Sequence, residues 1–260
     1  MTNKPYNHSS YTSQNYSSVE YKPATYAEST YAGTDYVASG FDSGADVRDN
    51  LLGKINLKDA RVAVLGLGEV GLPLAVEFAF GGFPTIGIDT AAATIDKLKN
   101  HQSPIATVPD EQIVHAADTG LTFSSDYDAL STADCVLVTE LAVSADHSDD
   151  DLTRLTGLIK KETLIILASV PYPSVVAEAI SARIALAPTL TIGVNIFVAF
   201  SAIPRHNDNP PYRFKSDLNT VGGITPFCMA LASALYRRIF NRVQSHSIPP
   251  DPHPGESSKP

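Results

Sequence analysis

The sequence predicts an α/β domain built on a doubly wound parallel sheet. Between about residues 61 and 240, short apolar segments alternate with amphipathic ones, and this alternation is typical of parallel strands joined by helices. Three glycines follow the first apolar segment, Val62-Ala63-Val64-Leu65, and open a predicted helix. Asp89 follows the second apolar segment, 18 residues after Gly71. Together these observations indicate a Rossmann-type sheet.

The elements follow one another in a regular order. Strands are expected at about residues 61–65, 84–88, 121–124, 134–139, 163–168 and 192–200, and helices at about 70–80, 91–100, 127–132, 151–160 and 174–184. In the first helix, Leu74 and Phe78 stand at one-face spacing and predict packing on the sheet. A last helix is expected from Thr225 to about Ile239, because Thr is typical of the N-cap and Pro226 of the first helical position.

Both ends of the chain are expected to be disordered, which leaves a single domain at residues 56–242. The tail at residues 1–55 carries a tyrosine at every fifth position, and a period of five fits neither a helix nor a strand. These residues are Tyr6, Tyr11, Tyr16, Tyr21, Tyr26, Tyr31 and Tyr36, with Phe41 completing the series. The repeat could serve weak self-association or tyrosine modification, or have no defined role. Residues 243–260 form a Pro-rich tail.

The glycine turn has the spacing of a dinucleotide-binding fingerprint. Gly66 permits the tight turn from strand to helix, Gly68 lets the backbone approach a pyrophosphate, and Gly71 lets helix and strand pack closely. The pyrophosphate would then lie on N–H groups at the amino terminus of the helix. The candidate cofactor-binding residues in the turn are Gly66, Leu67, Gly68, Glu69, Val70 and Gly71.

Asp89 predicts that the cofactor is NAD. A carboxylate at the end of the second strand can accept both ribose hydroxyls of NAD. The 2′-phosphate of NADP would bring like charges within about 4 Å, at a cost of roughly 4 kcal/mol for an effective dielectric constant near 20. The alternative is that Asp89 is the N-cap of the helix that follows it.

A longer stretch resembles a known family. Residues 64–79, which surround the glycine turn, resemble the opening of the UDP-glucose/GDP-mannose dehydrogenases, especially the branch that oxidises UDP-N-acetylhexosamines. The resemblance covers about residues 58–240 and includes Ser103-Pro104-Ile105 and Val221-Gly222-Gly223. It implies NAD-dependent oxidation of a sugar C6 hydroxyl to a carboxylate in two steps. Further candidate cofactor contacts are Thr94, Thr139 and Ser169.

The sequence departs from the family pattern near the expected nicotinamide. Glu69 replaces a Tyr of the glycine turn, which places a negative charge near the pyrophosphate. Residues 141–143 replace a Pro-Thr-Pro loop, and residues 168–170 keep only the Ser of a Glu-Ser-Thr stretch. Ile203 stands where the family has an acid/base Glu, and Ile cannot transfer a proton. No catalytic residue is therefore assigned.

Two functional interpretations remain open. Family members continue into a second domain that carries a nucleophilic Cys, whereas Cys135 and Cys228 of this chain are expected to be core residues. In the first interpretation, the chain is the NAD-binding domain of a nucleotide-sugar 6-dehydrogenase and depends on a separate sugar-binding chain. In the second, it is a pseudoenzyme or truncated product that binds NAD in a scaffold or regulatory role.

Composition limits the other partners. A net charge of −9 with scattered basic residues disfavours nucleic acid and anionic membranes. Residues 184–203 carry no charge, but Pro188, Gly193 and Asn195 disfavour a membrane-spanning helix. The alternation and β-branched residues at 192–200 favour a buried strand instead. No metal site is expected, because residues 146–151 lack the pattern of a calcium loop. Two cysteines and no secretory signal predict a cytoplasmic protein, with its oligomeric state open.

Overall fold

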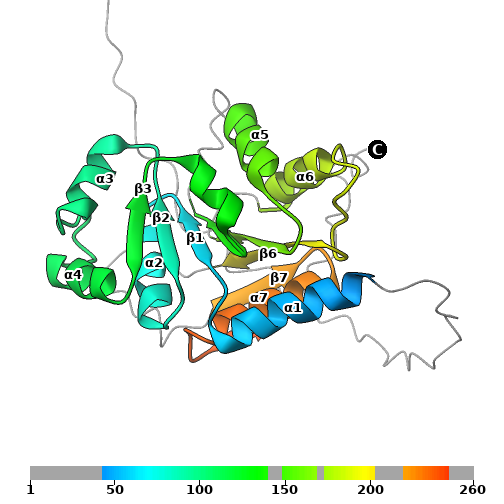
Figure 1. Cartoon of the computed structure of the whole chain (residues 1–260), viewed down its shortest axis with the longest axis horizontal. Helices are drawn as coiled ribbons and strands as arrows, with labels where there is room; N and C mark the ends of the chain where they lie inside the picture. Colours follow the sequence, from blue (N-terminus) through cyan, green and yellow to red (C-terminus); the bar gives the residue numbers. More distant parts are fainter. Residues whose placement is uncertain (1–42, 140–147, 169–172, 203–218, 246–260) are drawn as a thin grey trace, which may run out of the picture. The chain divides into compact units, whose positions relative to one another are not determined.

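The computed structural model describes residues 43–139, 148–168, 173–202 and 219–245, which form one sheet covered by helices (Figure 1). The strand order in the sheet is β3-β2-β1-β4-β5-β6-β7-β8. Neighbours among β1 to β6 pair in parallel, β7 is antiparallel to β6, and β8 is parallel to β7. The predicted doubly wound sheet is thus confirmed. The strands are β1 (Val62–Leu65), β2 (Thr85–Ile88), β3 (Leu121–Ser124), β4 (Cys135–Val138), β5 (Thr163–Ala168), β6 (Ile196–Ala202), β7 (Asn219–Gly223) and β8 (Val243–Ser245).

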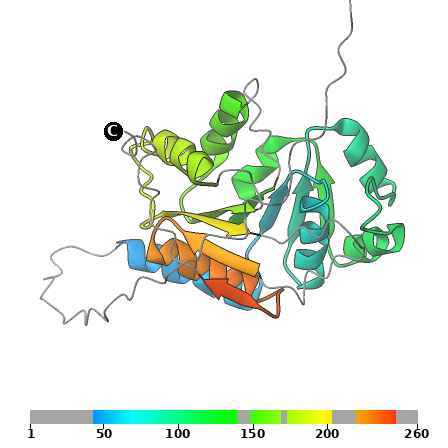
Figure 2. The same ribbon diagram turned by 180° about the vertical axis from the view of Figure 1, so that it is seen from behind.

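Helices cover both faces of the sheet, as Figures 1 and 2 show from opposite sides. The first face carries α1 (Ser43–Leu57), α2 (Gly71–Phe80), α3 (Ala92–Lys99), α4 (Asp110–Asp118) and α7 (Pro226–Tyr236). The second face carries the 3-10 helix η1 (Tyr127–Thr132), α5 (Ser148–Leu158) and α6 (Pro173–Ile184). Along β1, Val62 and Val64 pack toward the first face, while Ala63 and Leu65 pack toward the second. Burial on both faces explains the unbroken apolar runs of the central strands.

The first five strands begin at the expected residue or one residue later, but β6 begins later than expected. Residues 192–200 were expected to form this strand. Instead, Gly193 has a φ of +82°, and the Asn195 side chain accepts a hydrogen bond from the Thr191 backbone N at 2.8 Å. These contacts make a turn, so the strand starts at Ile196. Among the described residues, no helix is long and apolar enough to cross a membrane.

The helix α1 corrects the expectation that residues 1–55 are all disordered. Its apolar residues Val47, Leu51 and Ile55 recur every fourth position, and the last two are completely buried. Figures 1 and 2 both place α1 beside α7, where the Arg48 guanidinium lies 4.6 Å from the centre of the Phe227 ring. The sequence signal for this helix was weak, because the apolar pattern is short and adjoins a low-complexity tail. The burial of these apolar residues also depends on α7, which lies far along the chain. The tyrosine repeat itself lies outside the described residues.

Four further elements differ from the sequence-based expectation. The segment at residues 127–132 is a 3-10 helix, and α4 was not expected. The strands β7 and β8 were not expected either, and β8 lies within residues 243–260, which were assigned to the Pro-rich tail. β7 contains two glycines and β8 has a single apolar residue. Such segments become strands through pairing with a neighbour rather than through their own propensity.

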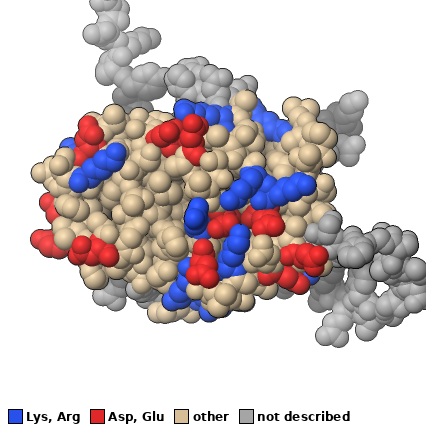
Figure 3. Space-filling model, viewed as in Figure 1, with Lys and Arg blue, Asp and Glu red and all other residues tan. Residues whose placement is uncertain are grey.

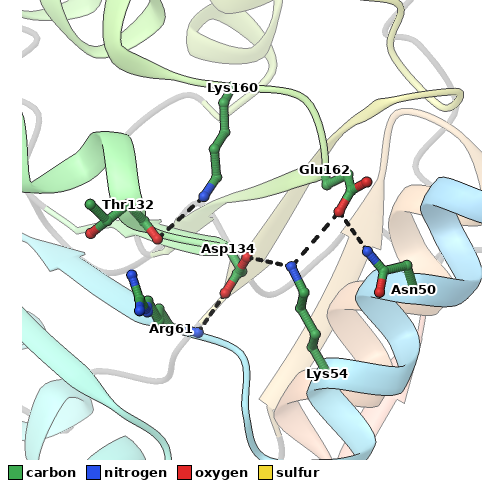
Figure 4. Close-up of polar contacts among 7 residues, drawn as sticks. All are labelled: Asn50, Lys54, Arg61, Thr132, Asp134, Lys160 and Glu162. Atoms are coloured by element: carbon green, nitrogen blue, oxygen red, sulfur yellow. Dashed lines mark hydrogen bonds and ion pairs between the residues drawn. The ribbon is translucent and has the colours of Figure 1, made fainter.

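A polar cluster fastens α1 to the edge of the sheet at which β4 and β5 begin (Figure 4). The Asp134 carboxylate is 7% exposed and accepts hydrogen bonds from Lys54 Nζ at 3.0 Å and the Arg61 backbone N at 2.9 Å. Lys54 Nζ also lies 3.7 Å from Glu162 Oε2, which accepts a hydrogen bond from Asn50 at 2.7 Å. Asp134 is therefore a buried charge compensated by a cation and an amide.

On the face drawn in Figure 3, Lys and Arg side chains lie among Asp and Glu side chains. This face of the described residues has no large region of positive charge alone. Binding to the phosphates of nucleic acid requires such a region. The scattered basic residues of the sequence therefore stay scattered on this side of the folded chain.

Replacing Asp134 tests the cluster that fastens α1. Asp134→Ala should lower the free energy of unfolding by about 2 kcal/mol, because it leaves the Arg61 N–H without its acceptor and leaves the Lys54 ammonium with only the more distant Glu162 carboxylate. Urea denaturation followed by circular dichroism measures the change. The control is Asp49→Ala on the exposed side of α1, which should change stability by no more than about 0.5 kcal/mol. Equal effects of the two substitutions would contradict this role for Asp134.

Candidate functional site

The glycine turn lies between the end of β1 and the start of α2. Gly66 has a φ of +89°, a conformation that side chains with a Cβ rarely adopt. Its backbone N donates a hydrogen bond to the Ile88 carbonyl oxygen at 2.8 Å, so the turn starts against the end of β2. The first glycine therefore makes the tight turn that the sequence predicts.

Gly71 lets the backbone of α2 approach that of β1 closely. A Cβ on Gly71 would lie 1.7 Å from the Gly66 carbonyl oxygen and 2.6 Å from Thr139 Oγ1. Thr139 follows β4 and is 2% exposed, and its hydroxyl lies 2.8 Å from the Gly66 carbonyl oxygen and 3.1 Å from that of Leu65. Thr139 thus stands at the candidate site, where it donates to the turn itself.

Leu67 turns its side chain into the core, below the backbone of the turn. It is 1% exposed, and a Cβ on Gly87 would lie 2.9 Å from its Cδ2 atom. Gly87 in β2 therefore makes room for the turn from below. Gly87 was not among the predicted site residues, although a glycine inside a strand is itself a signal of close approach.

Asp89 follows β2 and reaches the turn. Its Oδ2 accepts a hydrogen bond from the Leu67 backbone N at 2.9 Å, and its Oδ1 accepts one from the Ala91 backbone N at 2.8 Å. The N-cap of α3 is Ala91, with no side-chain cap, so the alternative that Asp89 caps this helix is wrong. Each carboxylate oxygen has a second acceptor position, so the half-buried Asp89 can still accept ribose hydroxyls.

The other candidate cofactor-binding residues differ in their burial and in their position relative to the turn. Gly68 is half-buried and its carbonyl accepts a hydrogen bond from the Leu72 N at 3.1 Å, and Glu69 is exposed. Val70 is the N-cap of α2 and has no polar side chain to cap its first turn. Thr94 is half-buried in the first turn of α3. Ser169 lies outside the described residues.

These groups fit a dinucleotide. A helix amino terminus without a side-chain cap presents N–H groups that suit a pyrophosphate, and the turn before it brings the backbone close. The Asp89 carboxylate, at the end of the neighbouring strand β2, is hydrogen-bonded to the same turn. Among the described residues, no group of three or more His, Cys, Asp or Glu side chains could hold a metal ion.

A comparison with protein families agrees with this geometry. Residues 60–240 match the model of the UDP-glucose/GDP-mannose dehydrogenase family, NAD binding domain. The chain belongs to this family. Its cofactor is NAD, and the resemblance noted in the sequence is confirmed.

Several relatives share this domain. UDP-N-acetyl-D-glucosamine 6-dehydrogenase of Pseudomonas aeruginosa is 28% identical over 190 residues, which are 70% of this chain and 44% of that protein. UDP-N-acetyl-D-mannosamine dehydrogenase of Escherichia coli K12 is 23% identical over 205 residues, 68% of this chain and 45% of that protein. The chain thus spans less than half the length of these curated relatives.

Solved structures show the same fold. UDP-D-ManNAc dehydrogenase from Pyrococcus horikoshii superimposes with a TM-score of 0.64 at 22% identity, covering 72% of this chain and 47% of that one. A ternary complex of GDP-mannose dehydrogenase from Pseudomonas aeruginosa gives a TM-score of 0.63 at 18% identity, covering 72% of this chain and 46% of that one. At these identities the likeness concerns the fold.

The two cysteines are core residues, as the sequence predicts. Both are completely buried. Burial, and then the charge of Asp134, raises the pKa of the Cys135 thiol far above its ordinary value, which disfavours a thiolate. Cys228 Sγ accepts a hydrogen bond from the Val198 backbone N at 3.3 Å and lies 3.1 Å from Thr225 Oγ1. Neither sulfur is placed to attack a substrate.

Other family positions have structural roles or lie outside the described residues. Ser201, two residues before Ile203, is buried with its Oγ 2.7 Å from the Tyr236 hydroxyl. This hydrogen bond joins β6 to α7 inside the core. Residues 141–143, 169–170 and 203–204, at which the sequence departs from the family, are not among the described residues.

A methyl group at Gly71 should disrupt the turn. Gly71→Ala places a Cβ against the backbone of Gly66, so NAD binding should be lost in calorimetric titration and stability should fall by more than about 2 kcal/mol. The matched control is Gly53→Ala in α1, where nothing lies within 4 Å of an added Cβ. That change should stabilise the protein by about 0.5–1 kcal/mol. Normal NAD binding by the Gly71 variant would contradict the close approach.

The burial of both sulfurs predicts their reactivity. In the native protein neither Cys135 nor Cys228 should react with a disulfide reagent such as Ellman's reagent, because the attacking species is an exposed thiolate. Both should react at once in guanidinium chloride. Rapid native labelling of one cysteine, located by peptide mass spectrometry, would show that this thiol is accessible.

Proposed function

We propose that this chain holds NAD between the glycine turn and Asp89. The amino terminus of α2 receives the pyrophosphate, and Asp89 accepts the hydroxyls of the adenosine ribose. The observation that supports this assignment is the hydrogen bond of 2.9 Å from the Leu67 backbone N to Asp89 Oδ2. It ties the acceptor for the ribose to the backbone that receives the phosphates, so both halves of the site keep a fixed spacing before the cofactor arrives.

We infer that the chemistry served by this cofactor is the oxidation of a nucleotide sugar. NAD, when bound, supplies the hydride acceptor. The curated relatives are named as dehydrogenases of UDP-N-acetyl-D-glucosamine and UDP-N-acetyl-D-mannosamine, which supports a UDP-N-acetylhexosamine as substrate class. The part played by this chain's residues is to bind and orient the cofactor at the carboxyl edge of the sheet.

We further propose that the chain does not complete this oxidation by itself. Oxidation of an alcohol to a carboxylate through a covalent intermediate needs an activated nucleophile. Cys135 and Cys228 are both buried in the core, and Ser201 is hydrogen-bonded to Tyr236. The same observations favour the second candidate function, an NAD-binding protein without turnover that acts as a scaffold or regulator. A separate sugar-binding chain with a nucleophile would distinguish the two by restoring turnover.

Replacing Asp89 tests the assignment of the ribose site. Asp89→Asn should weaken NAD binding about tenfold, since it removes a charge-assisted acceptor, and should strengthen NADP binding, since it removes a like charge. Calorimetric titration of each cofactor measures the ratio of the two dissociation constants. Asp118→Asn, an equal change of charge at the exposed end of α4, is the control and should leave the ratio unchanged.

The outcomes of these titrations are distinct. A wild-type chain that fails to bind NAD overturns the proposed site. An Asp89→Asn variant with the NAD-to-NADP ratio of the wild type overturns the role of Asp89 alone. Steady production of NADH from a UDP-sugar by the isolated chain, followed by the absorbance of reduced nicotinamide, would overturn the proposal that the chain lacks turnover.

A further inference from the structure

Glu69 makes a contact that the family pattern does not predict. It stands inside the glycine turn, its side chain is exposed, and its Oε2 accepts a hydrogen bond from Thr107 Oγ1 at 2.9 Å. Thr107 belongs to the connection between α3 and α4, 38 residues further along the chain. The hydrogen bond therefore joins the candidate pyrophosphate site to a different part of the fold.

The α3–α4 connection is a firm support for this contact. Val108, next to Thr107, is 2% exposed and belongs to the hydrophobic core. The Ser103 backbone N donates to Asp110 Oδ1 at 2.7 Å, and the Ser103 hydroxyl donates to the Ile105 carbonyl oxygen at 2.9 Å. Thr107 thus lies in a hydrogen-bonded connection next to a buried core residue, and its hydroxyl donates to the Glu69 carboxylate.

The charge of Glu69 acts on the helix and on a bound anion in opposite directions. A carboxylate just before the amino terminus of α2 is favourable for the helix dipole. The same carboxylate repels phosphates that bind at this terminus. The turn, residues 66–71, contains no Lys or Arg that would neutralise it, and the other ionised side chain at the turn, Asp89, is also negative.

We propose that Glu69, positioned by Thr107, makes the site selective for dinucleotides over nucleotides with a terminal phosphate. Each phosphate of a dinucleotide is bonded to a ribose on one side and to the other phosphate on the other side, so it carries one negative charge. A terminal phosphate, as in ADP or ATP, carries about −1.5 to −2 at neutral pH. Repulsion by Glu69 is therefore greater for ADP than for NAD. This inference rests on the proposed NAD site and names the class of ligand that the site disfavours.

The test is Glu69→Gln, which removes the charge and keeps an oxygen that can accept from Thr107. In calorimetric titrations at low salt, the dissociation constant for ADP should fall about fivefold and that for NAD about twofold, the range expected for one charge at a helix terminus. Adenosine, which has no phosphate, should bind as to the wild type. High salt should reduce the differences, because it screens exposed charges.

Thr107 is tested as a positioning residue in two backgrounds. Thr107→Val removes the donor and should bring the NAD-to-ADP preference between those of the wild type and Glu69→Gln, because the released carboxylate spends less time near the phosphates. In the Glu69→Gln background the same change should leave the preference unaltered, since no charge remains to be positioned. Thr107→Ser keeps the hydroxyl donor and should retain the wild-type preference for NAD over ADP. A purely structural role for Thr107 would give equal effects in both backgrounds.

Two controls separate this inference from other effects. Asp118→Asn removes an equal charge far along α4 and should leave the preference for NAD over ADP unchanged. Glu69→Gln should lower the melting temperature slightly, since it removes a charge favourable to the helix, so tighter ADP binding cannot come from a more stable fold. If NAD binds but Glu69→Gln leaves the ADP and NAD affinities in the wild-type ratio, this inference is overturned. If the wild type binds no NAD, the proposed function fails instead.

Discussion

The candidate site depends on the close approach of two backbones, those of α2 and β1. Gly71 comes so near to Gly66 that a single Cβ would lie 1.7 Å from the Gly66 carbonyl oxygen. The Thr139 hydroxyl donates to that same oxygen from the end of β4, and Asp89 accepts from the Leu67 N from the end of β2. The turn is thus held from both neighbouring strands, so its backbone geometry is set by the sheet rather than by the turn alone.

A separate polar cluster stabilises the opposite edge of the sheet. Asp134, just before β4, is compensated by Lys54 and the Arg61 N–H, and through Lys54 it fastens α1 beside α7. Helix α1 lies before residues 60–240, which match the family's NAD-binding domain. Helix α1 contributes Leu51 and Ile55 to the core on the first face of the sheet.

The sequence predicted the centre of the fold well and its edges poorly. Strands β1 and β4 are apolar throughout, and β5 is apolar after Thr163, because they are buried on both faces, and such runs are visible in a sequence. The glycine spacing and Asp89 were visible because each is a local requirement of backbone or charge. Gly87 and Thr107 were not recognised at the site, because their roles consist of contacts with Leu67 and Glu69, which are distant in sequence.

The sequence by itself determined that the central strands run parallel, and it determined the glycine turn and the acidic residue that follows β2, since these follow from the alternation of elements, local backbone freedom and charge. Only the tertiary structure decided that residues 43–57 form a helix, that β7 runs antiparallel, and that Thr139 supports the turn by donating to its carbonyl groups. The physical reason is that each of these features gains its stability from a partner segment far along the chain, which no local pattern encodes.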